Sequence, residues 1–176
     1  MGERTEERQL LKELPEGVEE ELMFLHLRDM WAVDGLYYLG IEERFGTEAA
    51  TEIDAFVWRV MGKIEARKLK KLLQLEGSDL EKMIRALKFS GWAMDLEDKE
   101  WEHHDDHVIL RNVECRVQNT RKKDGLDVFP CKVVRFDFLR SFAKEFSEDI
   151  EVRCNQCPPD DLKGDFWCEW LFRMRD

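Results

Sequence analysis

Apolar residues recur at helical spacing through the first half of the chain. Between positions 18 and 45 they return every three or four residues, which predicts a long amphipathic helix. Gly46 is expected to end that helix, because glycine readily adopts the backbone angles of a helix terminus. Thr47 would then cap a second long helix that runs to about Leu75 with an apolar stripe of its own.

A third helix is predicted in the stretch EGSDLEKMIRALKFSGWA. Ser78 and Glu81 have the spacing of a capping box at its start, and Gly91 is expected to end it. The polar segment EWEHHDDH that follows is interpreted as a loop. The helical part of the chain is therefore expected to end near residue 99.

The pattern changes after about residue 100, where apolar and polar residues begin to alternate in HVILRNVECRV. Alternation is typical of a half-buried strand. The apolar face of this strand is placed at Ile109, Val113, Cys115 and Val117. A helix is predicted next, and its apolar stripe consists of Val134, Phe138, Phe142 and Phe146. Two further strands are predicted in IEVRC and DFWCEWLFRMR.

This order of elements predicts an α+β fold, in which an N-terminal helical part packs on a small C-terminal antiparallel sheet with one helix. Residues 1–16 are expected to form a charged lead-in. A single domain would follow at 17–176, made of a helical part at 17–99 and a cysteine-containing sheet part at 100–176.

The charge balance narrows the range of partners. The net charge is −11, and charged residues make up 38% of the chain, well above the usual quarter. Such a surface repels phosphates, so neither a nucleic acid nor an anionic membrane is an expected partner. No apolar run approaches the ~18 residues of a membrane span, and the charged first residues lack the apolar core of a signal peptide. We expect a cytoplasmic protein.

All five cysteines lie in the C-terminal third of the chain, at Cys115, Cys131, Cys154, Cys157 and Cys168. In a reducing compartment, clustered cysteines indicate metal binding or chemistry more often than disulfides. Cys154 and Cys157 form a C-x2-C pair, a spacing at which two thiolates bind one ion. A site for zinc or an iron–sulfur cluster, with ligands from these five thiols, is therefore one hypothesis. The other interpretation is that they are small buried core residues.

Cys131 differs from the other cysteines because it follows Pro130, a residue that favours the first turn of a helix. A thiol at a helix N-terminus lies at the positive end of the helix dipole, so its pKa is expected to fall. Cys131 is therefore the candidate nucleophile. The alternative is a helix-start residue without chemistry.

Several carboxylates fall where the first two helices would place apolar residues, namely Asp34, Glu42 and Asp54. A buried carboxylate is costly unless it is paired or serves a function. One interpretation is a pocket that they share with Trp31, Tyr37, Tyr38 and Trp58. Trp31, Tyr38, Glu42 and Trp58 would then contact a bound small molecule. The other interpretation is that the carboxylates form salt bridges, for instance to Arg59 or Arg67.

The segments MWAVDGLYYLGIEERFGTEAATEIDAFVW, FPC, CNQCPPD and FWCEW resemble an uncharacterised family of archaeal and bacterial cytosolic proteins. That family is similar to the L-2-amino-thiazoline-4-carboxylate hydrolases, and the resemblance covers residues 28–172. The tail around GDFWCEW is also similar to the 4-vinyl-reductase ligand-binding domain, which shares the architecture of nitric-oxide-sensing and Golgi-transport ligand-binding domains. The resemblance implies helices packed on an antiparallel sheet with a ligand cavity between them.

Three functions are compatible with these features. The first is a small-molecule-binding or sensor domain with a thiolate metal site. The second is a hydrolase of a cyclic amidine or thiazoline C–N bond, in which Cys131 attacks and Asp34 or Asp54 moves the proton. The third is an interaction module with structural cysteines. The expected partners are a small molecule and, because the long helices and the last strand could pair with a copy of themselves, a second chain.

Overall fold

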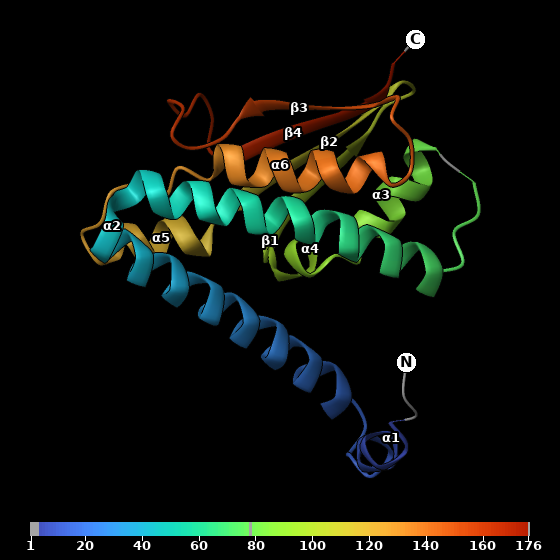
Figure 1. The fold of residues 1–176 in the computed structure, drawn as a ribbon. Coiled ribbons are helices and arrows are strands. Elements are labelled where there is room, and N and C mark those ends of the chain that lie inside the picture. The colour runs from blue at the N-terminus through green and yellow to red at the C-terminus, as the bar shows by residue number, and fades with distance from the viewer. Residues whose placement is uncertain (1–3, 78, 176) are drawn as a thin grey trace.

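A four-stranded antiparallel sheet and a long bent helix organise the fold (Figure 1). The computed structural model describes residues 4–77 and 79–175. The strands are β1 (Asp98–His103), β2 (His107–Glu114), β3 (Ile150–Gln156) and β4 (Cys168–Met174), in the spatial order β1-β2-β4-β3. The helices are α1 (Thr5–Lys12), α2 (Val18–Leu72), α3 (Leu80–Lys88), α4 (Gly91–Asp95), α5 (Arg116–Lys123) and α6 (Cys131–Lys144). The α+β class predicted from the sequence is confirmed.

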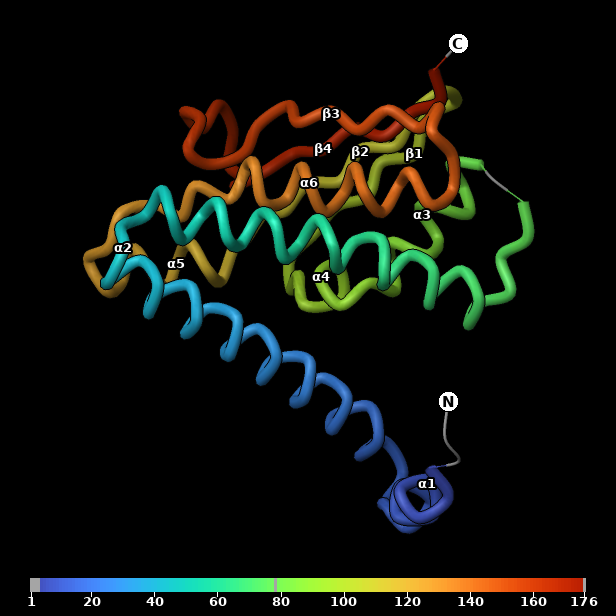
Figure 2. The backbone as a smooth tube through the Cα atoms, in the orientation of Figure 1, coloured from blue at the N-terminus to red at the C-terminus, as the bar shows by residue number. Residues whose placement is uncertain are grey.

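Helix α2 is bent at Gly46, whose φ of 86° is not helical. Glycine tolerates a positive φ because it has no Cβ. The predicted break at this residue is therefore present, as a kink inside one long helix. We call residues 18–45 the arm and residues 47–72 the core half of α2. The arm runs away from the sheet, and α1 lies at its far end (Figures 1 and 2).

Helix α6 lies between the core half of α2 and the sheet, as the tube in Figure 2 shows. Its predicted stripe is confirmed as core, because Val134, Phe138, Phe142 and Phe146 are all buried. Phe138 also packs edge-on against the rings of Trp58 and Trp92, with ring centroids 5.7 Å and 6.1 Å away. Burying a side chain of this size contributes about 1.5–3 kcal/mol.

Three local predictions about helix ends are wrong. Thr47 donates its hydroxyl to Glu42 Oε1 over 2.9 Å instead of capping a new helix. Helix α3 is capped by Asp79, whose carboxylate accepts the backbone N–H of Lys82, and Ser78 lies outside the described residues. Gly91 begins α4 instead of ending α3, because the Ser90 hydroxyl caps a new helix there.

The polar segment EWEHHDDH is not a loop, since most of it belongs to β1 and the tight connection to β2. The predicted face of β2 is also wrong. The buried side chains of this strand are Val108, Leu110 and Asn112, so Ile109 and Val113 lie on the opposite, less buried face. Cys115 lies just beyond the strand, at the N-cap position that precedes α5.

Candidate functional site

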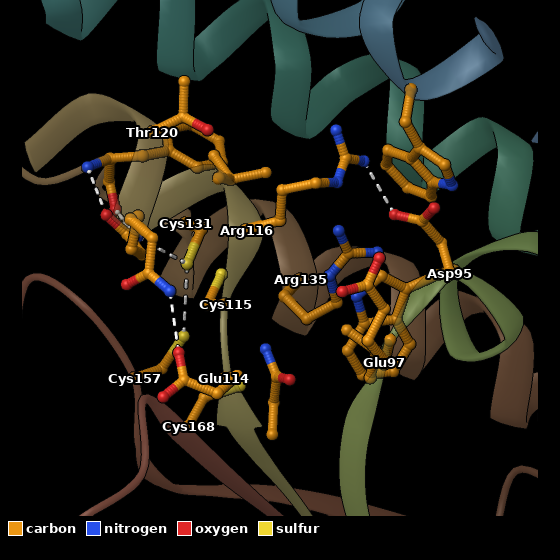
Figure 3. Close-up of a pocket in the computed structure, with 18 of the residues that line it drawn as sticks. Asp95, Glu97, Glu114, Cys115, Arg116, Thr120, Cys131, Arg135, Cys157 and Cys168 are labelled. Atoms are coloured by element: carbon orange, nitrogen blue, oxygen red, sulfur yellow. Dashed lines mark hydrogen bonds and ion pairs between the residues drawn. The ribbon is translucent and has the colours of Figure 1, made fainter. Parts of the chain in front are cut away.

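A cavity of about 420 Å³ lies where the arm, α4, α5 and the start of α6 meet the ends of β2 and β4 (Figure 3). Its apolar lining includes Trp31, Trp92 and Phe129. Its polar lining includes Asn112, Arg116, Gln118 and Arg135. The volume is in the range of small-molecule sites.

Four thiols line this cavity, and each comes from a different element. Cys115 precedes α5, Cys131 begins α6, Cys157 follows β3 and Cys168 begins β4. The elements bring these residues together from positions up to 53 apart in the chain. The fifth thiol, Cys154, lies on β3 beside a bulge and borders a neighbouring surface groove.

Cys157 is the centre of the thiol cluster, which we define as Cys131, Cys154, Cys157 and Cys168. The Sγ atoms of Cys131 and Cys157 are 3.5 Å apart. Hydrogen bonds with the neighbouring thiols, together with burial, raise the pKa of Cys157. A hydrogen bond from Cys157 lowers the pKa of Cys154 and that of Cys168. The C-x2-C pair, Cys154 and Cys157, thus lies beside Cys131 and Cys168, two thiols from distant parts of the sequence.

Cys115 lies in the same cavity but is not bonded to Cys157. Burial raises the pKa of its thiol to about 12, so this group stays a neutral thiol at physiological pH. It therefore resembles an inert buried cysteine more than a ligand or a nucleophile.

Cys131 is the first residue of α6, as the sequence predicts, and Pro130 precedes it. Gln118 Nε2 lies 3.6 Å from its Sγ and is positioned to donate. The Gln118 amide is itself fixed by two hydrogen bonds with the backbone of Phe129, over 2.8 Å and 2.9 Å. A thiolate at this position would thus meet a preoriented N–H donor.

All five cysteines are free thiols in the structure, and none of them forms a disulfide. Within residues 4–77 and 79–175, no three His, Cys, Asp or Glu side chains already stand around a common point as a bound ion requires. The Sγ separation of Cys131 and Cys157 is nevertheless close to the ~3.8 Å expected for two thiolates on tetrahedral zinc with Zn–S bonds of ~2.3 Å.

Arg135 is the buried cation of the cavity. It lies one turn after Cys131 on α6, and its guanidinium carbon is 4.4 Å from the centre of the Trp92 ring and 5.7 Å from that of Trp31. Its Nη1 is buried without a hydrogen-bond partner, and Asp54 and Asp34 act on it through the attraction of their charges. Arg116 Nε is a second buried N–H without a partner in the same cavity.

Asp34 and Asp54 lie on the two halves of α2, close enough to Arg135 to be attracted by its charge. Burial raises the pKa of Asp34. Burial, together with the negative charge of Asp34, raises the pKa of Asp54 to about 7. The indole of Trp58 hydrogen-bonds with both carboxyl groups and opposes these shifts. Neither aspartate is among the residues that line the thiol-lined cavity.

The predicted aromatic and acidic pocket on α2 is replaced by packed contacts. Trp31 and Trp58 stack on each other with centroids 4.7 Å apart, and of the two only Trp31 reaches the cavity. Tyr38 is buried and bonds to the Thr51 hydroxyl, whereas Tyr37 is 72% exposed. Glu42 forms a salt bridge, but with Arg121 of α5, through two hydrogen bonds of 2.8 Å and 2.9 Å. The hydrogen bonds from Arg121 lower the pKa of Glu42, because they stabilise the carboxylate more than burial destabilises it.

Arg135, Arg116 and Gln118 were not predicted as site residues from the sequence. A signal for Arg135 is present, because it interrupts the apolar stripe of α6 beside Val134 and Phe138. A charged residue next to core positions indicates a buried partner or ligand. No comparable signal marks Gln118, which is buried only because α5 packs over the start of α6.

The comparisons with known proteins give the family of the chain. The model of a family of unknown function, DUF6125, matches residues 16–174, and the chain belongs to that family. No curated protein and no solved structure matches the chain. In the part of the chain that the structure describes, no helix has both the length and the apolar character to cross a bilayer.

Proposed function

We propose that this protein is a small-molecule-binding domain whose cavity binds an organic anion. The observation that carries this proposal is the buried guanidinium of Arg135, which faces a cavity of about 420 Å³ with an unpartnered N–H. A buried charge is stable only when it is paired or hydrogen-bonded. The aspartates behind it supply attraction at longer range, and a bound carboxylate would supply the missing hydrogen bonds.

The lining of the cavity narrows the chemistry of that anion. Trp31, Trp92 and Phe129 provide flat apolar surface, which favours a planar or aromatic body. Arg135 and Arg116 both offer unpartnered N–H groups to an oxyanion. A small planar carboxylate therefore fits this lining better than a cation or a neutral sugar.

The test is binding of a panel of aromatic and heterocyclic monocarboxylates, measured by calorimetry and by the shift in melting temperature. Arg135→Met is expected to weaken binding at least 30-fold, because a buried charge-assisted hydrogen bond is lost. Lys123→Gln removes an exposed cation at the same cavity and is expected to change affinity less than about threefold. Equal losses in the two variants would mean that only net charge matters, and the proposal would be wrong.

We also propose that the thiol cluster binds one zinc ion or an iron–sulfur cluster at the wall of the cavity. Its support is the convergence of three thiols, from α6, β3 and β4, on Cys157 in the loop after β3. Four Cys ligands are the usual set for a structural zinc or an iron–sulfur site. A bound metal would also tie the start of α6 to the sheet.

Metal content of protein purified without oxygen tests this second part. About one zinc per chain, or a brown chromophore, is the expected result. Cys157→Ser should abolish it, whereas Cys115→Ser should leave it unchanged and so controls for the loss of any buried thiol. Replacement of zinc by cobalt adds a readout, since thiolate-to-cobalt absorption reports the ligand number. Metal loss in both variants would contradict the assignment of ligands.

Hydrolysis with Cys131 as nucleophile is the second candidate function. The observation in its favour is the placement of Cys131 in the cavity with the Gln118 amide fixed beside its Sγ. The proposed base is less well placed, because neither Asp34 nor Asp54 lines that cavity. Turnover of cyclic amidine carboxylates that disappears in Cys131→Ser, while binding is retained, would favour this function over simple binding.

A further inference from the structure

Exposed apolar side chains follow both halves of α2. On the arm, Met30, Val33 and Tyr37 recur at helical spacing, and Leu36 lies beside them. On the core half, Ile53, Phe56, Val57, Val60 and Ile64 form a second such row. We call these nine residues the α2 stripe. The stripe lies away from the buried side chains of the same helix, such as Tyr38 and Trp58.

The α2 stripe is too large for the surface of an ordinary monomer. Leu36 is 68% exposed and Tyr37 72%, and Phe45 beside the kink is 71% exposed. A half-exposed aromatic side chain presents on the order of 100 Å², so the stripe approaches the ~800 Å² that one partner contributes to a stable interface. The largest apolar patch of a typical monomer is about 300–600 Å².

The charges at the two ends of α2 are opposite. The first turn of the arm carries Glu19, Glu20 and Glu21, whereas the last turns of the core half carry Lys68 and Lys71, and all five are exposed. Gly46 lies near the middle of the helix. An antiparallel copy of α2 that is related by a two-fold axis near Gly46 would therefore place the acidic end of each helix beside the basic end of the other.

We propose that the α2 stripe binds a second copy of this chain, with the two α2 helices antiparallel. Self-complementary charge and an apolar row on each half of the bent helix suit a two-fold symmetric interface, in which the arm of one chain lies on the core half of the other. Phe45, next to the kink, would meet its own counterpart near the axis. The inward faces of both arms remain attached to their own body through Trp31 and Glu42, so the cavity stays within one chain.

The test is the mass of the full-length protein by analytical ultracentrifugation over a concentration series. Wild type is expected at twice 21.1 kDa. Leu36→Glu with Tyr37→Glu should raise the dissociation constant at least 100-fold, because two central apolar contacts become buried charges. Leu126→Glu with Leu162→Glu makes the same change at exposed apolar residues outside the stripe and should leave the dimer intact.

A charge exchange tests the antiparallel arrangement. Lys68→Glu with Lys71→Glu should weaken the dimer, and so should Glu20→Lys with Glu21→Lys. Mixing the two variant chains should restore a dimer that contains one of each. A wild-type monomer at every concentration, or a dimer that the Leu36 and Tyr37 variant does not weaken, would overturn the proposal, whether the stripe then binds another protein or nothing.

Discussion

The cavity region and the arm of α2 depart in opposite ways from the usual rule that apolar side chains are buried and charged ones are exposed. At the cavity, polar and ionisable groups are buried, among them Arg135, Cys157 and Cys168. On the arm, large apolar groups such as Leu36 and Tyr37 are exposed to solvent. Each arrangement costs free energy in an isolated chain, since charges prefer water and apolar surface avoids it.

The difference indicates what kind of binding partner would satisfy the exposed or unpaired groups of each region. The buried unpartnered N–H groups would be satisfied by a ligand small enough to enter the cavity, and on our proposal the nearby thiols bind a metal. An exposed apolar helix face requires a surface of similar length. On the two proposals, one chain would carry a small-molecule site and a protein interface, separated by the packed residues of α2 itself.

The largest expected effect sharpens the contrast between packed and exposed aromatic residues. Phe138→Ala removes a fully buried ring that contacts Trp58 and Trp92, and should lower the free energy of unfolding by about 3–5 kcal/mol. Tyr37→Ala on the arm should change it by less than ~0.5 kcal/mol at concentrations where the chain is monomeric. Chemical denaturation of both variants makes the measurement. Equal losses would show that the arm is packed in solution.

Two glycines give a matched comparison of the two halves of α2. A Cβ on Gly62 would lie 2.5 Å from the Phe138 carbonyl oxygen and 2.3 Å from Ser141 Oγ, so Gly62→Ala should destabilise the protein by about 2–3 kcal/mol. A Cβ on Gly35 would meet nothing within 4 Å. Gly35→Ala should therefore stabilise the helix by about 0.5–1 kcal/mol. Thermal melts distinguish the two signs, and destabilisation by Gly35→Ala would contradict the open arm.

The last effect concerns the ionisation of Asp54, which changes stability only as the pH changes. Its pKa of about 7 in the folded protein lies above the unfolded value of 3.8, so the folded state keeps a proton that the unfolded chain has lost. Stability should therefore fall as the pH rises from about 4 to about 7. Asp54→Asn should flatten this pH dependence, because the group that titrates is removed. Denaturation of both proteins across that range tests the sign, and identical pH profiles would show that the carboxyl group is hydrated.

Much of the fold could be predicted from sequence periodicity. The stripe of α6, the kink at Gly46 and the strands around Val152 and Trp170 all follow from spacing alone. The face of β2 could not, because Ile109 and Leu110 are equally apolar and only the pairing with β4 decides which is buried. Strand β1 could not be predicted from the sequence, because its residues are mostly polar and its stability comes from pairing with β2.

Only those parts of the site that have distinctive residue types could be predicted from the sequence. The five cysteines were recognisable by type, and Cys131 by its proline. Their convergence on Cys157 depends on tertiary contacts between α6 and the loop after β3, such as the hydrogen bond from Lys132 N to Pro158 O. The two interpretations of the α2 carboxylates, a pocket or salt bridges, could not be decided, because the sequence does not show that Arg121 pairs with Glu42 or that Trp31 stacks on Trp58.

Native mass spectrometry of full-length protein purified without oxygen is the most direct test of the central claim, that the buried polar groups of the cavity form a binding site. We expect a chain incubated with a planar carboxylate and zinc to carry the extra mass of both bound species, and we expect denaturation to remove it. Arg135→Met should lose the organic part and Cys157→Ser the metal part. A native mass equal to that of the bare chain, with neither species retained at millimolar concentration, would contradict it.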